Sequence, residues 1–548
     1  MSVELPASWG DKQTWSIPHH LDRQASIAPD RPFLQIEAGA AVTFGEMRGR
    51  ARRAAAALAS VGVRQGSTVV IMAPTSLEFV DVWFGTNLLG AADVPLNVAY
   101  RSHTLSHGVN TSEAQVMVIH GDYLPLLAEV EEDLRHLTTV VVLGASDVRL
   151  ERLTVVAFDD LPSAPVPALP PVGPRDLATV LYTSGTSGPA KGVLMPHAQV
   201  YAIAREVIDG LRIGPDDIFY CFHPLFHMAG KYGGIYAALI LGSKIVLDRS
   251  FDAAVWIDRV RQYGATVSIA HGPMIEMIHA QPERIDDAEN PLRSFIAAPF
   301  PAAIAHDFER RFDARGIEVW GMTEVTCVSW QPFDEPVRLG SCGKPREDLF
   351  EVLVVDPDTD EPVPVGSAGE ITVRPLHAWT TMQGYIGMPE QTIEAWRNLR
   401  FHTGDLGRFD EDGYLYFVDR TKDRIRRKAE NISSYDVEVA ALSHPGVLEC
   451  AAIGIAAEFT ADDEIKIVVV PREGVELDPV SLVTHMTARL PHYMVPRFVE
   501  MVEALPRTPT NKVQKNVLRQ MGVTETTWDR REAGVSVRAL RDQMEVGR

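Results

Sequence analysis

The chain has 548 residues, of which 46% are hydrophobic and 23% are charged, a composition typical of globular proteins. This length supplies buried core for more than one domain, so a small binding module is excluded. Lysine and arginine number 52 against 73 aspartate and glutamate, which gives a net charge of −21. Because a field of this sign repels phosphate backbones and acidic lipid surfaces, we expect no nucleic-acid partner.

The four cysteines lie far apart in the sequence, and no CxxC pair occurs. Such spacing is typical of reduced thiols rather than of a disulfide framework or a zinc site. The N-terminal residues show no basic segment followed by an apolar run, and no stretch of about 18 apolar residues occurs. We therefore expect a cytoplasmic protein with no membrane insertion.

Strand-like apolar runs alternate with amphipathic helical segments through the first 400 residues or so. Glu46 to Val61 has a helical pattern, Thr68 to Met72 is typical of a strand, and another helix ends near Leu89. Between Leu161 and Pro174, six of fourteen residues are proline, which predicts a linker within the large domain. The alternation predicts an α/β fold of stacked, mainly parallel sheets with helices.

The pattern changes near Gly340 to short strands such as Glu351 to Val355 and Gly369 to Val373, separated by turn residues. These strands predict a small antiparallel β-barrel subdomain at about 340–420.

A domain boundary is expected near Arg420, where a compact α+β pattern begins. It contains a helix over Asn431 to Leu442 and a strand over Cys450 to Ala456, followed by a second strand. We therefore predict an N-terminal domain at 1–420 and a small α+β C-terminal domain at 421–548. No repeat of 20 to 50 residues occurs, which excludes solenoids and propellers.

The segment YTSGTSGPAKG, from Tyr182 to Gly192, begins at the end of a predicted strand over Ala178 to Tyr182 and is crowded with hydroxyl groups and glycines. Backbone N–H groups and hydroxyls in such a loop can surround phosphate oxygens while Lys191 supplies positive charge. The loop is not of the Walker type, because GK[ST] is absent and a strand over Val193 to Met195 follows. The sequence favours a phosphate-binding loop over a P-loop ATPase; a flexible surface turn is the structural alternative.

Further motifs follow in order: WGMTE at 320–324, FHTGD at 401–405, DRTKD at 419–423 and PRTPTNK at 506–512. Together with YTSGTSGPAKG they resemble the signatures of the adenylate-forming superfamily, and in particular its acyl-CoA ligase branch. The resemblance spans roughly residues 30–520. It implies a C-terminal lid domain that moves about a hinge near 420–423.

The resemblance implies that ATP or AMP binds to a set of motif residues: Thr183, Ser184, Gly185, Thr186, Ser187, Gly188, Lys191, Ala297, Ala298, Pro299, Trp320, Gly321, Met322, Thr323, Asp405, Phe417 and Arg420. The ring of Trp320 can stack on a base, and Asp405 can accept hydrogen bonds from two ribose hydroxyls. Glu324 offers a hard oxygen ligand that suits Mg²⁺ beside ATP phosphates. Without the resemblance, Glu324 would be an exposed loop carboxylate and Asp405 a turn former.

The resemblance implies three catalytic residues, Lys512, Glu324 and His227. Adenylation brings a carboxylate to the α-phosphate of ATP, so negative charge builds on the phosphoryl oxygens, and the ammonium of Lys512 can bridge both anions. The implied hinge residue is Lys422, about which the lid alternates between two half-reactions. The structural alternatives are a core histidine at position 227 and a solvated surface lysine at position 512.

Residues 422–428 reverse the charge of the chain, because five of these seven residues are basic and one is acidic. The coenzyme A site that we predict consists of Arg426, Arg427, Lys428, Ala429 and Glu430. Its basic side chains would bind the phosphates of coenzyme A; a solvated basic face is the alternative. Ala429 stands where the family usually has glycine, which adds a methyl group to the implied pantetheine tunnel.

A predicted helix after His227 carries the candidate acyl pocket, which we assign to Met228, Gly230, Lys231 and Gly234. Gly230, Gly234 and Ala238 recur every four residues, so one helix face is stripped of side chains. That face either opens a wide acyl pocket or packs closely on a neighbour. A pocket lined by Lys231 would disfavour a cationic acid, so the sequence points weakly to a medium or bulky apolar carboxylate.

These observations predict an ATP-dependent acyl-CoA ligase that uses Mg²⁺, forms acyl-AMP and pyrophosphate, and then transfers the acyl group to coenzyme A. An adenylating enzyme that loads a carrier protein or stops at acyl-AMP is the alternative. A catalytically inactive nucleotide-binding regulator is disfavoured by Glu324 and Lys512. A serine hydrolase is disfavoured because the segment at 185–189 lacks the final glycine of GxSxG. The sequence is compatible with a homo-oligomer.

Overall fold

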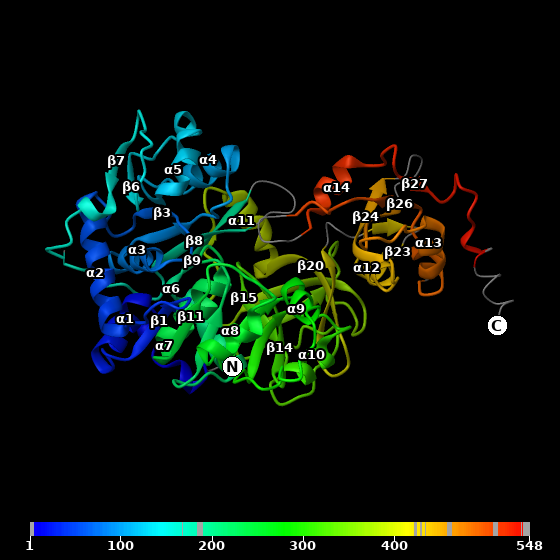
Figure 1. The fold of residues 1–548 in the computed structure, drawn as a ribbon, viewed down its shortest axis with the longest axis horizontal. Helices are drawn as coiled ribbons and strands as arrows, with labels where there is room; N and C mark the ends of the chain where they lie inside the picture. Colours follow the sequence, from blue (N-terminus) through cyan, green and yellow to red (C-terminus); the bar gives the residue numbers. More distant parts are fainter. Residues whose placement is uncertain are drawn as a thin grey trace.

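The computed structural model describes residues 5–166, 168–183, 190–420, 425–427, 430–432, 434–456, 463–490, 492–507, 513–538 and 540. Two large, mainly parallel sheets with helices around them form the main body of the molecule (Figure 1). An antiparallel sheet follows, and the C-terminal residues form a separate α+β unit at its side (Figure 1). The predicted fold class is confirmed.

The eight-stranded sheet contains the hairpin that carries the phosphate loop. Its strands are, in order, β19 (Gly384–Tyr385), β9 (Lys191–Pro196), β8 (Leu177–Thr183), β4 (Ala92–Pro95), β3 (Thr68–Met72), β5 (Val116–His120), β6 (Thr139–Leu143) and β7 (Thr154–Ala157). From β8 to β7 neighbouring strands run parallel, whereas β8 and β9 are antiparallel.

The nine-stranded sheet has a central parallel set whose carboxyl ends share one edge. Its strands are, in order, β16 (Lys344–Pro345), β15 (Thr326–Trp330), β14 (Arg315–Met322), β13 (Ser294–Ala298), β12 (Val267–His271), β10 (Ile218–Cys221), β11 (Lys244–Leu247), β1 (Pro32–Ile36) and β2 (Val42–Thr43). Strands β14, β13, β12, β10, β11 and β1 are parallel, and ligands of such sheets bind at the carboxyl edge.

The α-helices of the described residues include the two predicted near Glu46 to Val61 and ending near Leu89. They are α1 (Ile17–Ile27), α2 (Phe44–Ser60), α3 (Leu77–Leu88), α4 (Ser102–Thr111), α5 (Leu124–Ala128), α6 (His197–Leu211), α7 (Ala237–Leu241), α8 (Trp256–Tyr263), α9 (Gly272–His279), α10 (Ala305–Phe312), α11 (Pro389–Ala395), α12 (Ser434–Leu442), α13 (Pro479–Thr487) and α14 (Lys515–Met521). None of these helices is both long and apolar enough to span a bilayer.

Helix α6 lies between the two large sheets. It contacts β8 and β9 of one sheet and β13 and β15 of the other, and almost all its residues are buried. A helix buried on all sides must satisfy its polar side chains inside the protein, so its glutamine and glutamate side chains bond to neighbouring segments.

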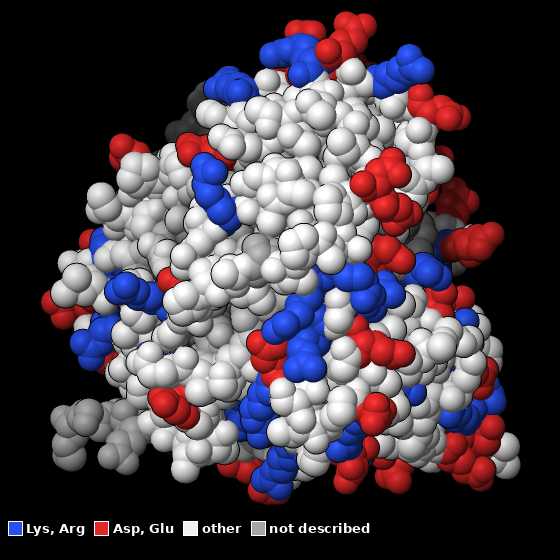
Figure 2. Space-filling view, turned by 90° about the vertical axis from the view of Figure 1, so that its left-hand side faces the viewer, with Lys and Arg blue, Asp and Glu red and all other residues white. Residues whose placement is uncertain are grey.

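The face drawn in Figure 2 carries lysine and arginine side chains interspersed with aspartate and glutamate around a broad uncharged area. Two neighbouring helices illustrate the pairing of opposite charges, since Arg50 of α2 bonds to Asp81 of α3 at 2.7 Å. Helix α2 begins with a capping box, in which Thr43 and Glu46 bond to each other's backbone N–H.

The β-rich subdomain contains a four-stranded antiparallel sheet in the order β17 (Phe350–Val355), β18 (Gly369–Pro375), β20 (Phe401–Phe409) and β21 (Leu415–Arg420). Its first two strands begin within one residue of the predicted positions.

The C-terminal residues form a two-stranded ribbon of β22 (Ile425–Arg427) and β23 (Glu430–Ile432), and a sheet of β24 (Val447–Ala456), β25 (Asp463–Pro471), β26 (Phe498–Met501) and β27 (Trp528–Asp529). The prediction that Asn431 begins a helix is wrong, because Asn431 and Ile432 pair with Arg426 and Ile425 in the ribbon. The helix α12 starts at Ser434.

Candidate active site

The phosphate-loop hairpin brings both ends of the loop together. Thr183 at the end of β8 pairs with Lys191 at the start of β9, and the Thr183 hydroxyl donates to the Lys191 carbonyl at 3.5 Å. The Lys191 ammonium lies 4.5 Å from the ring centroid of Tyr385. The hairpin therefore fixes where the loop leaves and re-enters the sheet, and Tyr385 orients its lysine.

Glu324 follows β14 and is held from two sides. The Tyr385 hydroxyl donates to its Oε1 at 2.9 Å, and its backbone carbonyl accepts from the Met382 amide at 2.9 Å. On the other side, Gln199 of α6 donates to the carbonyls of Thr323 at 2.8 Å and of Glu324 at 3.1 Å. The phosphate-loop lysine and the candidate metal ligand thus share one partner, Tyr385.

The donor set around Glu324 fits Mg²⁺. Its carboxylate is a hard oxygen ligand, only 8% exposed, and the lysine at the base of the phosphate loop lies beside the same tyrosine. Burial and the neighbouring Glu324 carboxylate raise the pKa of Tyr385, so its hydroxyl stays protonated and can donate.

Trp320 and Asp405 come from motifs 85 residues apart and meet in the structure. The indole Nε1 of Trp320 donates to Oδ2 of Asp405 at 3.2 Å, and both side chains are buried. In the antiparallel sheet, Asp405 pairs with Arg420, and Phe417 pairs with Gly407. The base-stacking candidate and the ribose-binding candidate therefore lie in contact.

The segment Ala297 to Pro299 continues the carboxyl end of β13. Ala297 pairs with Glu318 of β14, two residues before Trp320, and Ala298 pairs with His271 of β12. This register brings the segment to the edge of the sheet where the WGMTE motif leaves β14. Gly321 fits there because a Cβ would lie only 2.0 Å from the Thr326 carbonyl.

His227 lies beyond the carboxyl end of β10 and is half-buried. Its ring centroid is 5.7 Å from that of His271, and its Nδ1 accepts from the Ala229 amide at 3.3 Å. A neutral ring in this arrangement carries its proton on Nε2. The neighbouring His223 is instead buried in the core, and its pKa is lowered by burial and by His271 and His227.

The candidate acyl-pocket residues differ in exposure. The segment Ala229 to Tyr236 forms the predicted helix as a π-helix, in which all residues are buried. A Cβ at Gly230 would lie 2.6 Å from the His223 carbonyl, and one at Gly234 would lie 3.0 Å from Ile245. At these two glycines the structure favours close packing over an open pocket; Met228 is half-buried.

Lys231 lies in the core and pairs with Asp93 of β4, both side chains being fully buried. Its ammonium also lies 4.4 Å from the ring centroid of Trp83. Because Asp93 neutralises this charge inside the protein, Lys231 gives no argument against a cationic acid. That part of the substrate prediction is corrected.

Several predicted residues lie outside the described ones: Ser184, Gly185, Thr186, Ser187, Gly188, Lys422, Lys428, Ala429 and Lys512. The structure describes the backbone and not the side chains of Arg420, Arg426, Arg427 and Glu430. Their assigned roles stay predictions.

Three residues that no sequence motif indicated hold the segment around Glu324 by hydrogen bonds. Glu206 of α6 accepts from the Thr326 hydroxyl at 2.8 Å and from the Cys327 amide at 3.0 Å, which holds the turn after Glu324. Tyr385 and Gln199 are the other two. Each belongs to a segment without a motif, and only the packing of α6 and β19 brings them to the site.

The AMP-binding enzyme family is matched by residues 21–386, and its C-terminal domain by residues 436–512. The chain belongs to the AMP-binding enzyme family. It is 31% identical over 505 residues to a feruloyl-CoA synthase of Amycolatopsis sp, which covers 91% of this chain and 97% of that protein. It is 28% identical over 510 residues to the crotonobetaine/carnitine–CoA ligase of Salmonella typhimurium, covering 91% and 98%.

A solved structure with the same fold is the o-succinylbenzoate CoA synthetase of Bacillus subtilis in complex with its acyl-adenylate intermediate. The TM-score is 0.80 at 25% sequence identity, over 92% of this chain and 98% of that one. This AMP-binding enzyme is accordingly an AMP-forming acid–thiol ligase that uses a carboxylic acid, ATP with Mg²⁺, and coenzyme A.

Proposed function

We propose that this AMP-binding enzyme activates a medium or bulky apolar carboxylic acid at the edge formed by β10, β12, β13 and β14, and transfers it to coenzyme A. The contact between Trp320 and Asp405, with Glu324 four residues along the chain from Trp320, is the observation that supports this best. It brings the base-stacking, ribose-binding and metal-binding candidates to one place, as a nucleotide site requires.

Two partly exposed apolar side chains that follow β10 in the chain support the preference for an apolar acid. Phe226 and Met228 are half-buried, whereas the buried charges of Lys231 and Asp93 neutralise each other away from solvent. An apolar acyl group gains free energy by covering Phe226 and Met228. His227, between them in the sequence, is proposed to lie beside the acid carboxylate.

In the first half-reaction, a carboxylate oxygen of the acid attacks the α-phosphorus of ATP, and the bond to the pyrophosphate oxygen breaks. Lys512 is proposed to stabilise the charge that builds on the phosphoryl oxygens, and the phosphate loop with Lys191 to hold the β- and γ-phosphates. Mg²⁺, held by Glu324, would neutralise phosphate charge when bound.

In the second half-reaction, the thiol sulfur of coenzyme A attacks the acyl carbon, AMP leaves, and the thiol proton is lost to solvent. We assign residues 1–420 to the nucleotide-binding domain, residues 421–548 to the lid and Lys422 to the hinge. Rotation about Lys422 would remove Lys512 and admit the thiol. Lys422→Pro is then expected to slow thioester formation and to spare adenylation.

Within the basic segment 422–428, we propose that Arg426, Arg427 and Lys428 bind the phosphates of coenzyme A. Replacing these three residues by glutamine should raise the KM for coenzyme A and leave the KM for the acid unchanged. An equal rise in both KM values would contradict this assignment.

The function is tested by a pyrophosphate-release screen over aromatic, aliphatic and cationic acids, with and without coenzyme A. We expect acid-dependent pyrophosphate release with apolar acids and AMP release that depends on coenzyme A. A cationic acid as the best substrate would contradict the proposed acid class. Acyl-AMP that persists with coenzyme A but is consumed by a carrier-protein thiol would favour the carrier-loading alternative. The homo-oligomer remains a proposal that sedimentation can check.

A further inference from the structure

The TGD segment, which carries Asp405, leaves the regular ladder between β18 and β20. Glu370 pairs with Leu406 and Thr372 pairs with His402, so one residue of β18 faces three of β20. Such a bulge lifts residues out of the pleat and leaves backbone groups without ladder partners. The residues without a ladder partner in β18 are Thr403, Gly404 and Asp405.

The lost ladder bonds are replaced by side chains. Glu370 Oε1 accepts from the Gly404 amide at 3.0 Å. The Thr403 hydroxyl donates to the Ile371 carbonyl at 2.7 Å and accepts from the Asp405 amide at 3.1 Å. Gly404 has a φ of 70°, which glycine adopts without strain. The bulge therefore depends on one carboxylate, that of Glu370, for the amide immediately before Asp405.

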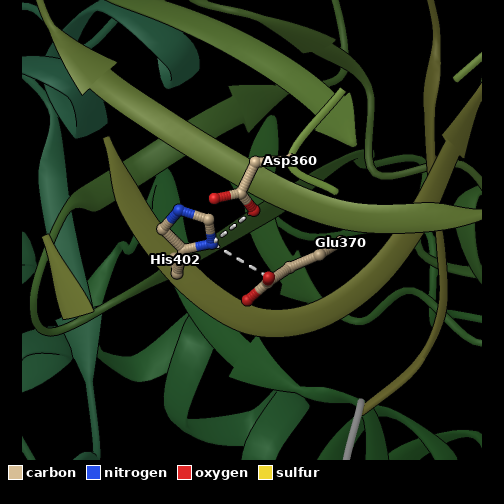
Figure 3. Close-up of side chains that lie close together, drawn as sticks. All are labelled: Asp360, Glu370 and His402. Carbon is tan, nitrogen blue, oxygen red and sulfur yellow. Dashed lines mark hydrogen bonds and ion pairs between the residues drawn. The ribbon is translucent and has the colours of Figure 1, made fainter. Parts of the chain in front are cut away.

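The second oxygen of Glu370 is held by two basic side chains. His402 Nδ1 lies 2.9 Å from Oε2, and the Arg397 guanidinium donates to the same oxygen at 3.0 Å. The carboxylate of Asp360 lies 3.9 Å from the same nitrogen, His402 Nδ1 (Figure 3). Because Glu370 and His402 are buried, their contacts hold the carboxylate in one orientation.

Asp360, Glu370 and His402 have ligand atoms within 4.8 Å of one another, a spacing that could hold a metal ion. Arg397, however, already supplies positive charge to both carboxylates, since its Nε also lies 3.7 Å from Asp360. A guanidinium at this distance opposes a divalent cation. The cluster is better explained by the bulge that it supports.

We propose that Glu370 is a positioning residue for ATP: oriented by His402 and Arg397, it holds the Gly404 amide and thereby presents Asp405 to the ribose hydroxyls. The inference rests on the proposed role of Asp405 in ribose binding. Loss of Glu370 should therefore weaken recognition of the ribose alone. A residue that merely stabilises the sheet would affect every nucleotide substrate alike.

The test compares ATP with 2′-deoxy-ATP and 3′-deoxy-ATP in acid-dependent pyrophosphate release by the full chain. In Glu370→Gln and Glu370→Ala, kcat/KM for ATP should fall by about 10-fold, mainly through KM, the scale of one hydrogen bond to a charged group. The kcat/KM for each deoxynucleotide should fall less than that for ATP, because each keeps only one hydroxyl for Asp405, so part of the discrimination against them is lost. The glutamine variant keeps one acceptor and guards against misfolding of the alanine variant.

Glu351→Gln is the matched control. Glu351 lies on β17 of the same sheet, and among the described residues its ion pairs are with Arg374 and Arg400 rather than with the bulge. Its replacement should leave the discrimination between ATP and the deoxynucleotides unchanged. Asp405→Asn serves as the reference for loss of the ribose contact.

The outcomes separate the two proposals. Lost discrimination in Asp405→Asn and in both Glu370 variants supports the inference. Lost discrimination in Asp405→Asn alone overturns the role of Glu370 and leaves that of Asp405 standing. Full discrimination in Asp405→Asn overturns the ribose role itself, and equal losses with all three nucleotides in the Glu370 variants show a purely structural residue.

Discussion

The hydroxyl of Tyr385 donates a hydrogen bond of 2.9 Å to Oε1 of Glu324 across 61 residues of sequence. The ring of the same tyrosine lies beneath the ammonium of Lys191. One side chain therefore orients both the candidate metal ligand and the candidate phosphate-binding lysine, so its two contacts can be separated by substitution.

Tyr385→Phe keeps the ring beneath Lys191 and removes the bond to Glu324. We expect kcat/KM for MgATP to fall about 10-fold, the scale of one hydrogen bond to a carboxylate, and the Mg²⁺ concentration for half-maximal rate to rise. Pyrophosphate exchange at varied Mg²⁺ measures both. Tyr416→Phe is the control, because Tyr416 also donates to a carboxylate, Asp410, at 3.1 Å outside the site. An equal effect in the two variants would refute a special role for Tyr385.

Lys512→Ala should lower adenylation by at least about 100-fold, the scale of losing one transition-state donor. The variant lacks the ammonium that is proposed to bridge the acid carboxylate and the α-phosphate. Pyrophosphate exchange reports this half-reaction, and the thioester half-reaction is measured separately with preformed acyl-AMP. An exchange rate near that of the unaltered enzyme would rule out the role.

Lys231→Met should destabilise the protein by about 3 to 5 kcal/mol, because it leaves the Asp93 carboxylate buried without its partner. Adding Asp93→Asn should recover part of the loss. Urea unfolding measures the free energies. Lys344→Met provides the comparison, since the partly exposed pair with Glu335 at 3.2 Å should contribute less than about 1 kcal/mol. Similar losses in both variants would contradict the buried-pair explanation.

Buried histidine should make the protein sensitive to acid. Burial lowers the pKa of His197 to about 3, whereas the unfolded chain has an ordinary histidine pKa of about 6.5. The contribution to stability is therefore complete above pH 6.5 and is lost as pH falls toward 3, by about 1.4 kcal/mol per unit.

The histidine prediction is checked by urea unfolding between pH 7 and pH 5. His197→Gln should flatten the dependence of the unfolding free energy on pH, whereas the exposed His136→Gln should not. Other buried histidines such as His20, whose pKa burial also lowers to about 3, contribute to the remaining slope. An unchanged slope in His197→Gln would show that this residue takes up its proton in the folded state.

Local pattern predicted the strands and loops of the site well. The strand β3 has the predicted bounds, β8 extends one residue beyond the predicted strand at each end, and the phosphate loop leaves and re-enters the sheet where its glycines and hydroxyls indicated. Apolar runs bounded by turn residues predict the ends of a strand to within a few residues. The same reasoning erred at Asn431, where pairing with the preceding strand β22 outweighed the helical pattern.

The glycine pattern after His227 shows the limit of periodicity. Spacing of four residues left both a wide pocket and close packing open, and only the neighbours of Gly230 and Gly234 in the fold favour close packing. The pairing of Lys231 with Asp93 likewise depends on strand β4, more than 130 residues away. No local pattern in a single sequence contains either fact.

The sequence alone was sufficient for the family, the reaction and the identity of the motif residues, because each motif is a contiguous run whose chemistry is local. Only the tertiary structure revealed what orients them: Tyr385 on Glu324, Trp320 on Asp405, and Glu370 on the bulge before Asp405. These contacts join segments that lie far apart along the chain, and hydrogen bonds of about 3 Å exist only after the sheets have packed.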